Sequence, residues 1–229
     1  MYELLTYETG FIFYILLFVF ISIIVKKLYI RDLSSQIILI GELFACVNSV
    51  LLTFISSAEF INIITVNHNL RIGICKIFMT YFIFDFFVIS YDYYLKPNSM
   101  YFIYIIHHIL CILILLLGIY TTQDNITIFS IIGIIEFTNI FKNIYILYTI
   151  FYSYTDNTSF ILLLLWTIFF IFCRVIILPF FIGKIYYYDI PENTITLSGG
   201  LIGIILLIIT QILMIMWGYK LVKKIYRQI

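Results

Sequence analysis

The chain has 229 residues, of which 64% are hydrophobic and only 11% are charged, and its formal net charge is +1 at pH 7. A soluble domain of this size has too little interior to hide so much apolar surface. The composition therefore predicts an all-α membrane protein whose solvent is lipid. The near-neutral charge gives nucleic acid no electrostatic footprint, so we expect no nucleic-acid partner.

Seven apolar stretches are long enough to cross the hydrocarbon core of a bilayer, which needs about 20 residues in a helix. Short polar connections separate them, and nothing indicates a second domain or a repeat. The sequence therefore predicts seven transmembrane helices, at residues 11–28, 37–57, 74–94, 100–120, 126–150, 159–183 and 199–220.

Lysine and arginine are distributed unevenly between the two predicted sides of the membrane. The positive-inside rule favours an N-terminus on the lumenal or external side and a cytoplasmic C-terminus, which requires an odd number of spans. With this topology the external loops contain only Arg71, Lys76 and Lys184. The cytoplasmic segments contain Lys26, Lys27, Arg31, Lys96, Lys220, Lys223, Lys224 and Arg227.

Polar or ionisable residues occur within the apolar run of every predicted helix from the second to the seventh. Such residues are expensive at membrane depth and by default mark a ligand site, a pathway or a reaction centre. The first helix has only Ser22, whose hydroxyl can bond to its own backbone. We therefore expect helices two to seven to enclose a polar cavity, with the first helix outside. The residues concerned are Glu42, Asp85, His107, His108, Glu136, Arg174 and Gln211.

The two adjacent histidines cannot both point at the same atom, because neighbouring residues differ by about 100° around a helix. We expect one ring of the His107-His108 pair to face the cavity and the other to face a neighbouring helix. Tyr104 and Cys111 each lie three or four residues from both histidines, so this face is lined by groups able to bond an imidazole.

The fifth predicted helix has a polar stripe, because Glu136, Asn139 and Asn143 stand at i, i+3 and i+7. Lys142 is expected on another face of that helix, extending toward the cytoplasmic surface. Glu42 and Gln211 are interpreted first as contacts between helices, since such polar pairs contribute about 0.6 to 2 kcal/mol.

Arg174 is harder to explain as a simple helix contact. A guanidinium at helix centre costs about 2.5 to 3.5 kcal/mol on insertion scales, and it keeps its proton. We therefore expect it to meet an anion, from Glu136, Asp85 or a phosphate or carboxylate of a ligand. Pro179, five residues later, predicts a kink that frees backbone carbonyls.

Taken in order, these residues resemble the TLC domain family. The resemblance covers residues 35–224, which leaves 1–34 as a first transmembrane helix with a cytoplasmic loop and 225–229 as a cytoplasmic tail. The order and spacing of the elements make it specific. It rests on Asp85 in the run YFIFDFF, His107 with His108, Glu136 with Thr138 and Asn143, Phe170 with Arg174 and Pro179, and Trp217 before a basic tail.

The resemblance implies a barrel of helices two to seven, open to lipid, in the endoplasmic reticulum or a related membrane. It also implies either lipid binding and trafficking or N-acylation, as in the ceramide synthase branch. That branch has a second His-Asp pair further along, where this chain has Ile134, Ile135 and Glu136. The chain also has Asn139-Ile140 where the common pattern has Thr-Pro. These departures favour the smaller, non-ceramide-synthase type.

The first functional hypothesis is a multi-pass protein that binds lipid or fatty acyl chains in an intramembrane cavity and contributes to membrane lipid homeostasis. It needs neither a cofactor nor a metal. Its expected ligand-binding residues are Asp85, Tyr104, Glu136, Asn139, Asn143 and Arg174.

The alternative is a lipid N-acyltransferase that uses acyl-CoA as co-substrate. His107 or His108 would act as the base or as the acyl acceptor, and Arg174 would hold a coenzyme A phosphate. A third possibility, a receptor or transporter, is raised by the seven spans alone. The last span has no lysine at its middle to form a retinal Schiff base, and no internal repeat indicates alternating access.

Overall fold

The computed structural model describes residues 7–28, 33–60, 68–95, 97, 99–121, 126–152, 156–189 and 197–228. Every regular element in these ranges is helical. The elements are α1 (Tyr7–Leu28), α2 (Leu33–Phe60), α3 (His68–Leu95), α4 (Ser99–Thr121), α5 (Ile126–Phe151), α6 (Asn157–Phe170), the π-helix η2 (Ile171–Ile177), α7 (Leu178–Lys184), the π-helix η3 (Ile185–Asp189) and α8 (Leu197–Tyr226).

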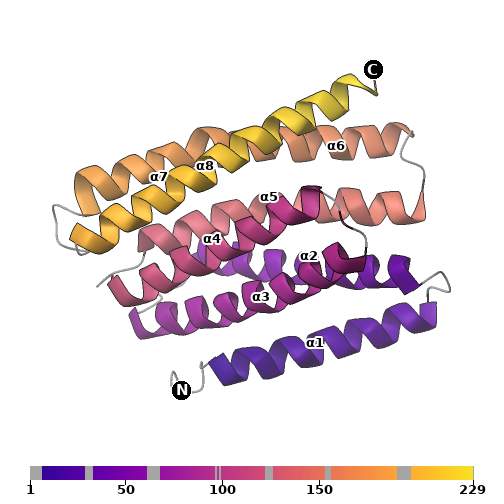
Figure 1. Ribbon diagram of the computed structural model, residues 1–229, viewed down its shortest axis with the longest axis horizontal. Coiled ribbons are helices and arrows are strands. Elements are labelled where there is room, and N and C mark those ends of the chain that lie inside the picture. The colour runs from indigo at the N-terminus through magenta and orange to yellow at the C-terminus, as the bar shows by residue number, and fades with distance from the viewer. Residues whose placement is uncertain are drawn as a thin grey trace.

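The helices lie side by side as one bundle of alternating direction (Figure 1). Because α6, η2, α7 and η3 follow one another without a break, the described residues form seven helical segments. Each of them contains the whole of one of the seven apolar stretches expected from the sequence. The segment α1 lies at one edge of the bundle, and α8 lies at the opposite edge with α6 and α7.

Helix neighbours form a closed circuit. The chief contacts join α2 to α5, α3 to α4, α5 to α6 and α4 to α8, while α6 also touches α8 and α2 touches α3. The remaining helix, α1, packs on α2 and α3 and lies outside this circuit. Six segments thus surround a common interior.

Four segments of the described chain are long and apolar enough to cross a membrane by length and composition. They are Tyr7–Lys27, Ile72–Tyr91, Asn157–Tyr187 and Gly199–Tyr226, and shorter apolar stretches occur at Leu39–Ile55 and Phe102–Leu117. Large apolar side chains point outward from the bundle, for example Leu16, which is 64% exposed, and Phe180, which is 74% exposed. Such a surface is stable in contact with lipid tails, so the chain is embedded in a membrane.

A buried hydrogen bond joins α1 to the rest of the bundle. The hydroxyl of Tyr14 donates to Oδ1 of Asn48 on α2 at 2.7 Å. The Tyr14 ring also packs edge-on against Phe44 and lies 5.9 Å from the ring of Tyr81 on α3. The hydroxyl of Ser22 donates to the carbonyl of Phe18 in its own helix, as the sequence predicted. Aromatic packing and this buried hydrogen bond therefore both help to dock α1.

The sixth segment changes its helical pitch where the sequence predicted a kink. The π-helix η2 precedes Pro179, which lies in the first turn of α7. Proline has no N–H, so it cannot donate to the carbonyl of Val175 four residues earlier. The side-chain amide of Gln211 on α8 donates to that carbonyl at 3.1 Å. Gln211 is thus a contact between helices, as expected, and it binds a carbonyl that the proline leaves without its usual partner.

Candidate functional site

A cavity of about 480 Å³ lies inside the circuit of helices, a volume typical of pockets for small ligands. Its walls come from all six segments of the circuit. Those that line it are Gly41, Glu42 and Ala45 of α2; Tyr81, Phe82, Asp85, Val88 and Ile89 of α3; Tyr104, His107 and His108 of α4; Glu136, Asn139, Lys142 and Ile146 of α5; Trp166 and Phe170 of α6; Arg174 of η2; and Trp217, Lys220, Leu221 and Lys224 of α8.

Most of the residues singled out in the sequence lie on this cavity. Asp85, Tyr104, His107, His108, Glu136, Asn139 and Arg174 all line it. Asn143 does not: it is completely buried, but it is absent from the cavity wall. The lining residues of α5 follow the spacing i, i+3, i+6 and i+10, which turns around the helix by about 60° at each step of three. Asn143, at i+7, lies about 20° from Glu136 around the helix, so helical angle alone does not explain why it is covered.

His108 is held at both ring nitrogens. Its Nε2 lies 2.7 Å from Oδ2 of Asp85, and its Nδ1 lies 2.8 Å from the backbone carbonyl of Tyr104. A backbone carbonyl only accepts, so Nδ1 carries a proton and donates it. The contact with Asp85 then contains a second proton, either on an imidazolium or on the carboxyl group. Both residues are buried, so this pair fixes the position of the ring.

His107 lines the cavity as well, so both rings reach it, while His108 also contacts the neighbouring helix α3 through Asp85. The two rings are nearly perpendicular, with centroids 5.6 Å apart. The Sγ of Cys111 lies 3.7 Å from Nδ1 and 3.6 Å from Nε2 of His107. The two nitrogens point in different directions from the ring, so the sulfur cannot form a well-aligned hydrogen bond with both. Trp217 packs edge-on against the ring at 5.3 Å. His107 is thus held chiefly by packing.

Arg174 is buried and meets uncharged acceptors. Its Nε donates to the hydroxyl of Thr138 at 2.6 Å, and its Nη2 donates to the carbonyl of Ile135 and to Oδ1 of Asn139, each at 2.6 Å. Among the described residues, no carboxylate lies within ion-pair distance of the guanidinium. Glu136 and Asp85 are therefore not direct partners of Arg174, and neutral oxygens of α5 accept from Nε and Nη2 instead.

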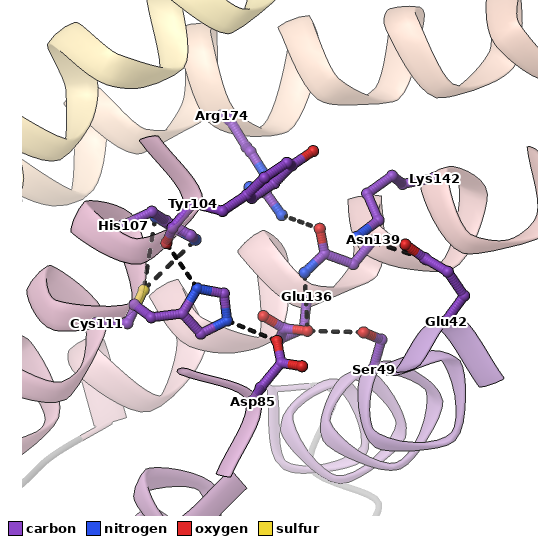
Figure 2. A network of polar contacts seen from close by, with 11 residues as sticks. Glu42, Ser49, Asp85, Tyr104, His107, Cys111, Glu136, Asn139, Lys142 and Arg174 are labelled. Atoms are coloured by element: carbon purple, nitrogen blue, oxygen red, sulfur yellow. Dashed lines mark hydrogen bonds and ion pairs between the residues drawn. The ribbon is translucent and has the colours of Figure 1, made fainter. Parts of the chain in front are cut away.

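Asn139 connects Arg174 to Glu136. Its amide oxygen accepts from the guanidinium, while its amide nitrogen donates to Oε2 of Glu136 at 3.0 Å. The same Oε2 accepts from the hydroxyl of Ser49 on α2 at 2.7 Å. Figure 2 shows this chain of contacts from Arg174 through Asn139 to Glu136 and Ser49. One bridging amide thus separates the two charged groups.

Oε2 of Glu42 lies 3.7 Å from Nζ of Lys142. Two other polar atoms, in residues that line the cavity, have no hydrogen-bond partner within the described part of the chain. They are Oε1 of Glu136, in a residue that is 1% exposed, and Nε1 of Trp217, in a residue that is 6% exposed. Leaving such a group buried without a partner costs about 1 to 3 kcal/mol, and more for a charged group. Both atoms are themselves covered by neighbouring side chains, so a ligand in the cavity meets them only when those side chains move.

Lys142 lines the same cavity as Glu136, although it lies on another face of α5, as expected. Its Nζ lies 3.7 Å from Oε2 of Glu42 on α2 and 5.5 Å from the centre of the Tyr104 ring. A lysine at i+6 is about 120° from Glu136 on the helix, but the cavity is wide enough to include both. Glu42, first interpreted as a simple helix contact, is the partner of this cavity lysine (Figure 2).

Three lining residues of α8 were not identified as site residues from the sequence. Trp217, Lys220 and Lys224 stand at i, i+3 and i+7 and form one row on the cavity wall. The sequence interpretation assigned the lysines to membrane topology and the tryptophan to the end of the last span. Their helical spacing was the signal that would have found them.

A second hollow, of about 680 Å³, lies on the outer side of the sixth segment. Its lining comes entirely from α7 and η3, namely Pro179, Phe180, Gly183, Lys184 and Tyr187. Phe180 and Tyr187 are more than 70% exposed there. This open apolar groove faces the surroundings of the bundle, and the polar chemistry lies in the inner cavity. In the described residues, no group of three His, Cys, Asp or Glu side chains is placed to hold a metal ion.

Comparison with known proteins identifies one family. The family model described as the TLC domain matches residues 9–223, which reach from the first turn of α1 almost to the end of α8. No curated protein and no solved structure matches the chain.

Proposed function

The chain belongs to the TLC-domain family of membrane proteins, and from this premise we propose that it binds a membrane lipid or fatty acyl chain in the inner cavity and contributes to membrane lipid homeostasis. The family match and the apolar helices place the chain in a membrane. The proposal adds a cavity ligand to that assignment, and it assigns the protein to the endoplasmic reticulum or a related membrane.

One observation carries the proposal. Oε1 of Glu136 and Nε1 of Trp217 are both buried on the cavity wall without a partner among the described residues. Other buried amide atoms, such as those of Asn143, also lack a partner in the described residues, but Glu136 and Trp217 belong to the wall of a cavity large enough for a ligand. Because an unmade hydrogen bond in a dry interior is costly, a ligand that meets these two atoms is favoured. A ligand with a hydroxyl or amide group satisfies both atoms.

The arrangement of the helices supports entry of a lipid. We interpret the closed circuit of α2, α3, α4, α8, α6 and α5 as a barrel around the cavity. Lys220 and Lys224 lie toward the end of α8, so the cavity reaches the end of the bundle where the chain finishes. By the positive-inside rule this end faces the cytoplasm. A lipid of the cytoplasmic leaflet then has its head group at the level of the opening.

A cavity-filling substitution tests the proposal. Gly41 lines the cavity, and a Cβ added there meets only one atom, Cγ1 of Val88 at 3.9 Å. Gly41→Leu should therefore fill the cavity without disturbing the backbone. Gly203→Leu is the matched control, because an added Cβ meets nothing within 4 Å.

The measurement is the amount of lipid per protein after gentle purification in detergent, identified by mass spectrometry. We expect a defined lipid with the native chain and with Gly203→Leu, and a loss of most of it with Gly41→Leu. Equal lipid content in all three proteins would show that the lipid is held outside the cavity and would contradict the proposal.

Acyl transfer is the second candidate, and the different settings of the two histidines favour it. His108 uses both nitrogens within the protein, whereas His107 has only the sulfur of Cys111 as a hydrogen-bond contact in the described residues. His107 would take the proton of a lipid amine as its nitrogen attacks an acyl thioester. The new C–N bond forms, the C–S bond breaks, and the leaving thiolate takes up the proton.

Lipid extracts of cells expressing the native chain and the variant His107→Gln test this second candidate. An acyltransferase of this kind predicts an acyl amide that accumulates with the native chain and is lost with the variant. An acyl-amide profile that is the same with the native chain, with the variant and without either would exclude this activity while leaving lipid binding in place.

A further inference from the structure

The opening of the inner cavity is lined by lysines, whereas the interior of the cavity is lined by histidines, carboxyl groups and amides. Lys142, Lys220 and Lys224 line it from two different helices, together with Tyr104 and Trp166. We propose that this opening, hereafter the lysine mouth (Lys142, Lys220 and Lys224), holds the phosphate of a negatively charged lipid head group that also carries free hydroxyls. This inference rests on the proposed lipid binding and specifies the class of lipid.

The lysine mouth lies beyond the histidines along the cavity. Trp217 marks the level of His107 and Tyr104, because its ring centre is 5.3 Å and 4.9 Å from theirs. Lys220 and Lys224 follow it on the same row of α8. At about 1.5 Å per residue, they lie roughly 5 Å and 10 Å further along the helix. A head group that spans this distance contacts the lysines at one end and reaches the level of Glu136 and Trp217 at the other.

Aromatic rings support two of the three ammonium groups. Nζ of Lys224 lies 4.7 Å from the centre of the Tyr145 ring, and Nζ of Lys142 lies 5.5 Å from that of Tyr104. A cation over the face of an aromatic ring is attracted by the ring quadrupole, so these contacts orient the ammonium groups. Lys142 and Lys220 belong to different helices, as do the two tyrosines. The charge is therefore arranged around the opening and not along one exposed helix face.

A phosphate matches this arrangement better than a neutral or positively charged head group. The three lysines outnumber the carboxylate of Glu42, which lies 3.7 Å from Nζ of Lys142, so the mouth has an excess of positive charge. This excess attracts an anion because lipid walls weaken solvent screening. A phosphate oxygen also accepts a charge-assisted hydrogen bond from each lysine. A hydroxyl beyond the phosphate can donate to Oε1 of Glu136 and accept from Nε1 of Trp217, the two atoms without a protein partner.

The flanks of the mouth favour a lipid over a soluble phosphate. Exposed apolar side chains accompany the lining row of α8, among them Ile215, Met216 and Tyr219, which are 51%, 47% and 68% exposed. Acyl chains attached to a bound head group can lie along this surface in the hydrocarbon region. A soluble phosphate compound gains nothing from these contacts.

Binding of phosphatidylglycerol is the direct test, since this lipid combines a phosphate with free hydroxyls. Its affinity for the purified full chain is compared with that of phosphatidylcholine by native mass spectrometry. The double variant Lys220→Gln, Lys224→Gln removes two charges from the mouth. The double variant Lys223→Gln, Arg227→Gln removes two charges from exposed positions of the same C-terminal region that do not line the cavity.

We expect the mouth variant to bind phosphatidylglycerol about tenfold more weakly or worse, with phosphatidylcholine unchanged and the control variant like the native chain. Lys220→Arg, Lys224→Arg keeps the charge and should keep the binding. Equal losses in the mouth and control variants would show nonspecific attraction to the surface and overturn the inference. So would loss of binding in a folded arginine variant.

Two further outcomes separate this inference from the proposal on which it rests. If the native chain binds both lipids equally, the head-group inference fails and lipid binding stands. If it binds neither lipid, nor any lipid from cell extracts, both fail. If sn-glycerol 3-phosphate at the same concentration as the lipid displaced it, the lysine mouth would be a site for a soluble phosphate compound. That result would overturn the inference that the ligand is a lipid.

Salt dependence provides a second measurement should the glutamine variant fail to fold. Phosphatidylglycerol binding to the native chain should fall several-fold between about 0.05 M and 0.5 M salt, because added ions screen a partly exposed mouth. A flat salt dependence would overturn the inference.

Discussion

The Nε2 atom of His108 lies 2.7 Å from Oδ2 of Asp85, while Nδ1 of the same ring donates to the backbone carbonyl of Tyr104. This pair joins α3 to α4 inside the cavity wall. One proton lies between Nδ1 and the carbonyl of Tyr104, and a second lies between Nε2 and the Asp85 carboxyl group. Removing one member therefore leaves the other buried with an unmet bond.

The first prediction follows from this pair. Asp85→Ala should lower the free energy of unfolding by about 1 to 3 kcal/mol, because Nε2 of His108 loses its partner. Asp85→Asn should lower it less, since an amide N–H can donate to a neutral Nε2 while Nδ1 still donates to Tyr104. Chemical denaturation in detergent measures both. If the two variants were equally destabilised, the hydrogen bond would not be what matters at this site.

Gln211 and Pro179 should depend on one another. Gln211→Ala should destabilise the bundle by about 1 kcal/mol, because the carbonyl of Val175 loses its donor. In a Pro179→Ala background residue 179 has an N–H that can donate to this carbonyl, so the same Gln211 change should matter less. A double-mutant cycle of unfolding free energies measures the coupling. Additive effects would mean that the proline does not create the need for Gln211.

Gly10 allows α1 to approach α3 closely. A Cβ at this position would lie 2.8 Å from Oγ1 of Thr80 and 3.4 Å from Cα of Ile77. Gly10→Ala should therefore destabilise the docking of α1 by about 1 to 3 kcal/mol. Gly203→Ala meets nothing within 4 Å and should stabilise α8 by up to about 1 kcal/mol through helix propensity. Thermal unfolding of the two variants should shift in opposite directions, and a shift in the same direction would refute the close contact.

Asp156 gives the connection between α5 and α6 a pH dependence. Its Oδ2 accepts from the hydroxyl of Tyr148 at 2.6 Å, and its Oδ1 accepts from the N–H of Ser159 at 2.7 Å, capping α6. These hydrogen bonds, that of Tyr148 first, lower the pKa of the Asp156 carboxyl in the folded state. At a pH near this pKa, the Asp156 carboxyl therefore binds fewer protons in the folded chain than in the unfolded chain. The stability that Asp156 contributes is fully present above the unfolded pKa near 3.9 and is lost as the pH falls below it.

The variant Asp156→Asn isolates this effect, because asparagine is also a good N-cap but does not titrate in this range. Between about pH 6 and pH 3, the unfolding midpoint of the native chain should fall further than that of the variant. Parallel curves for the two proteins would show that Asp156 does not contribute to the acid response.

Sequence reasoning found the helices and most of the candidate site because both follow from local rules. The lengths of the apolar stretches predicted the seven helical segments. The energetic cost of placing a charged side chain in lipid singled out Asp85, Glu136 and Arg174. It did not show that Lys142 lines the cavity or that Asn143 is covered, because both depend on how neighbouring helices pack against α5. It also missed the neutral acceptors of Arg174. The oxygens of Thr138 and Ile135 reach the guanidinium only after α5 and η2 pack together.

The amide of Asn139 keeps Arg174 and Glu136 from neutralising each other by direct contact. The interior therefore retains an electric dipole, with its positive pole at Arg174 and its negative pole at the carboxylate of Glu136 (Figure 2). A molecule with charges at both ends that enters such a field has one preferred orientation. Asn139, though uncharged, would thereby set which end of a guest molecule arrives first.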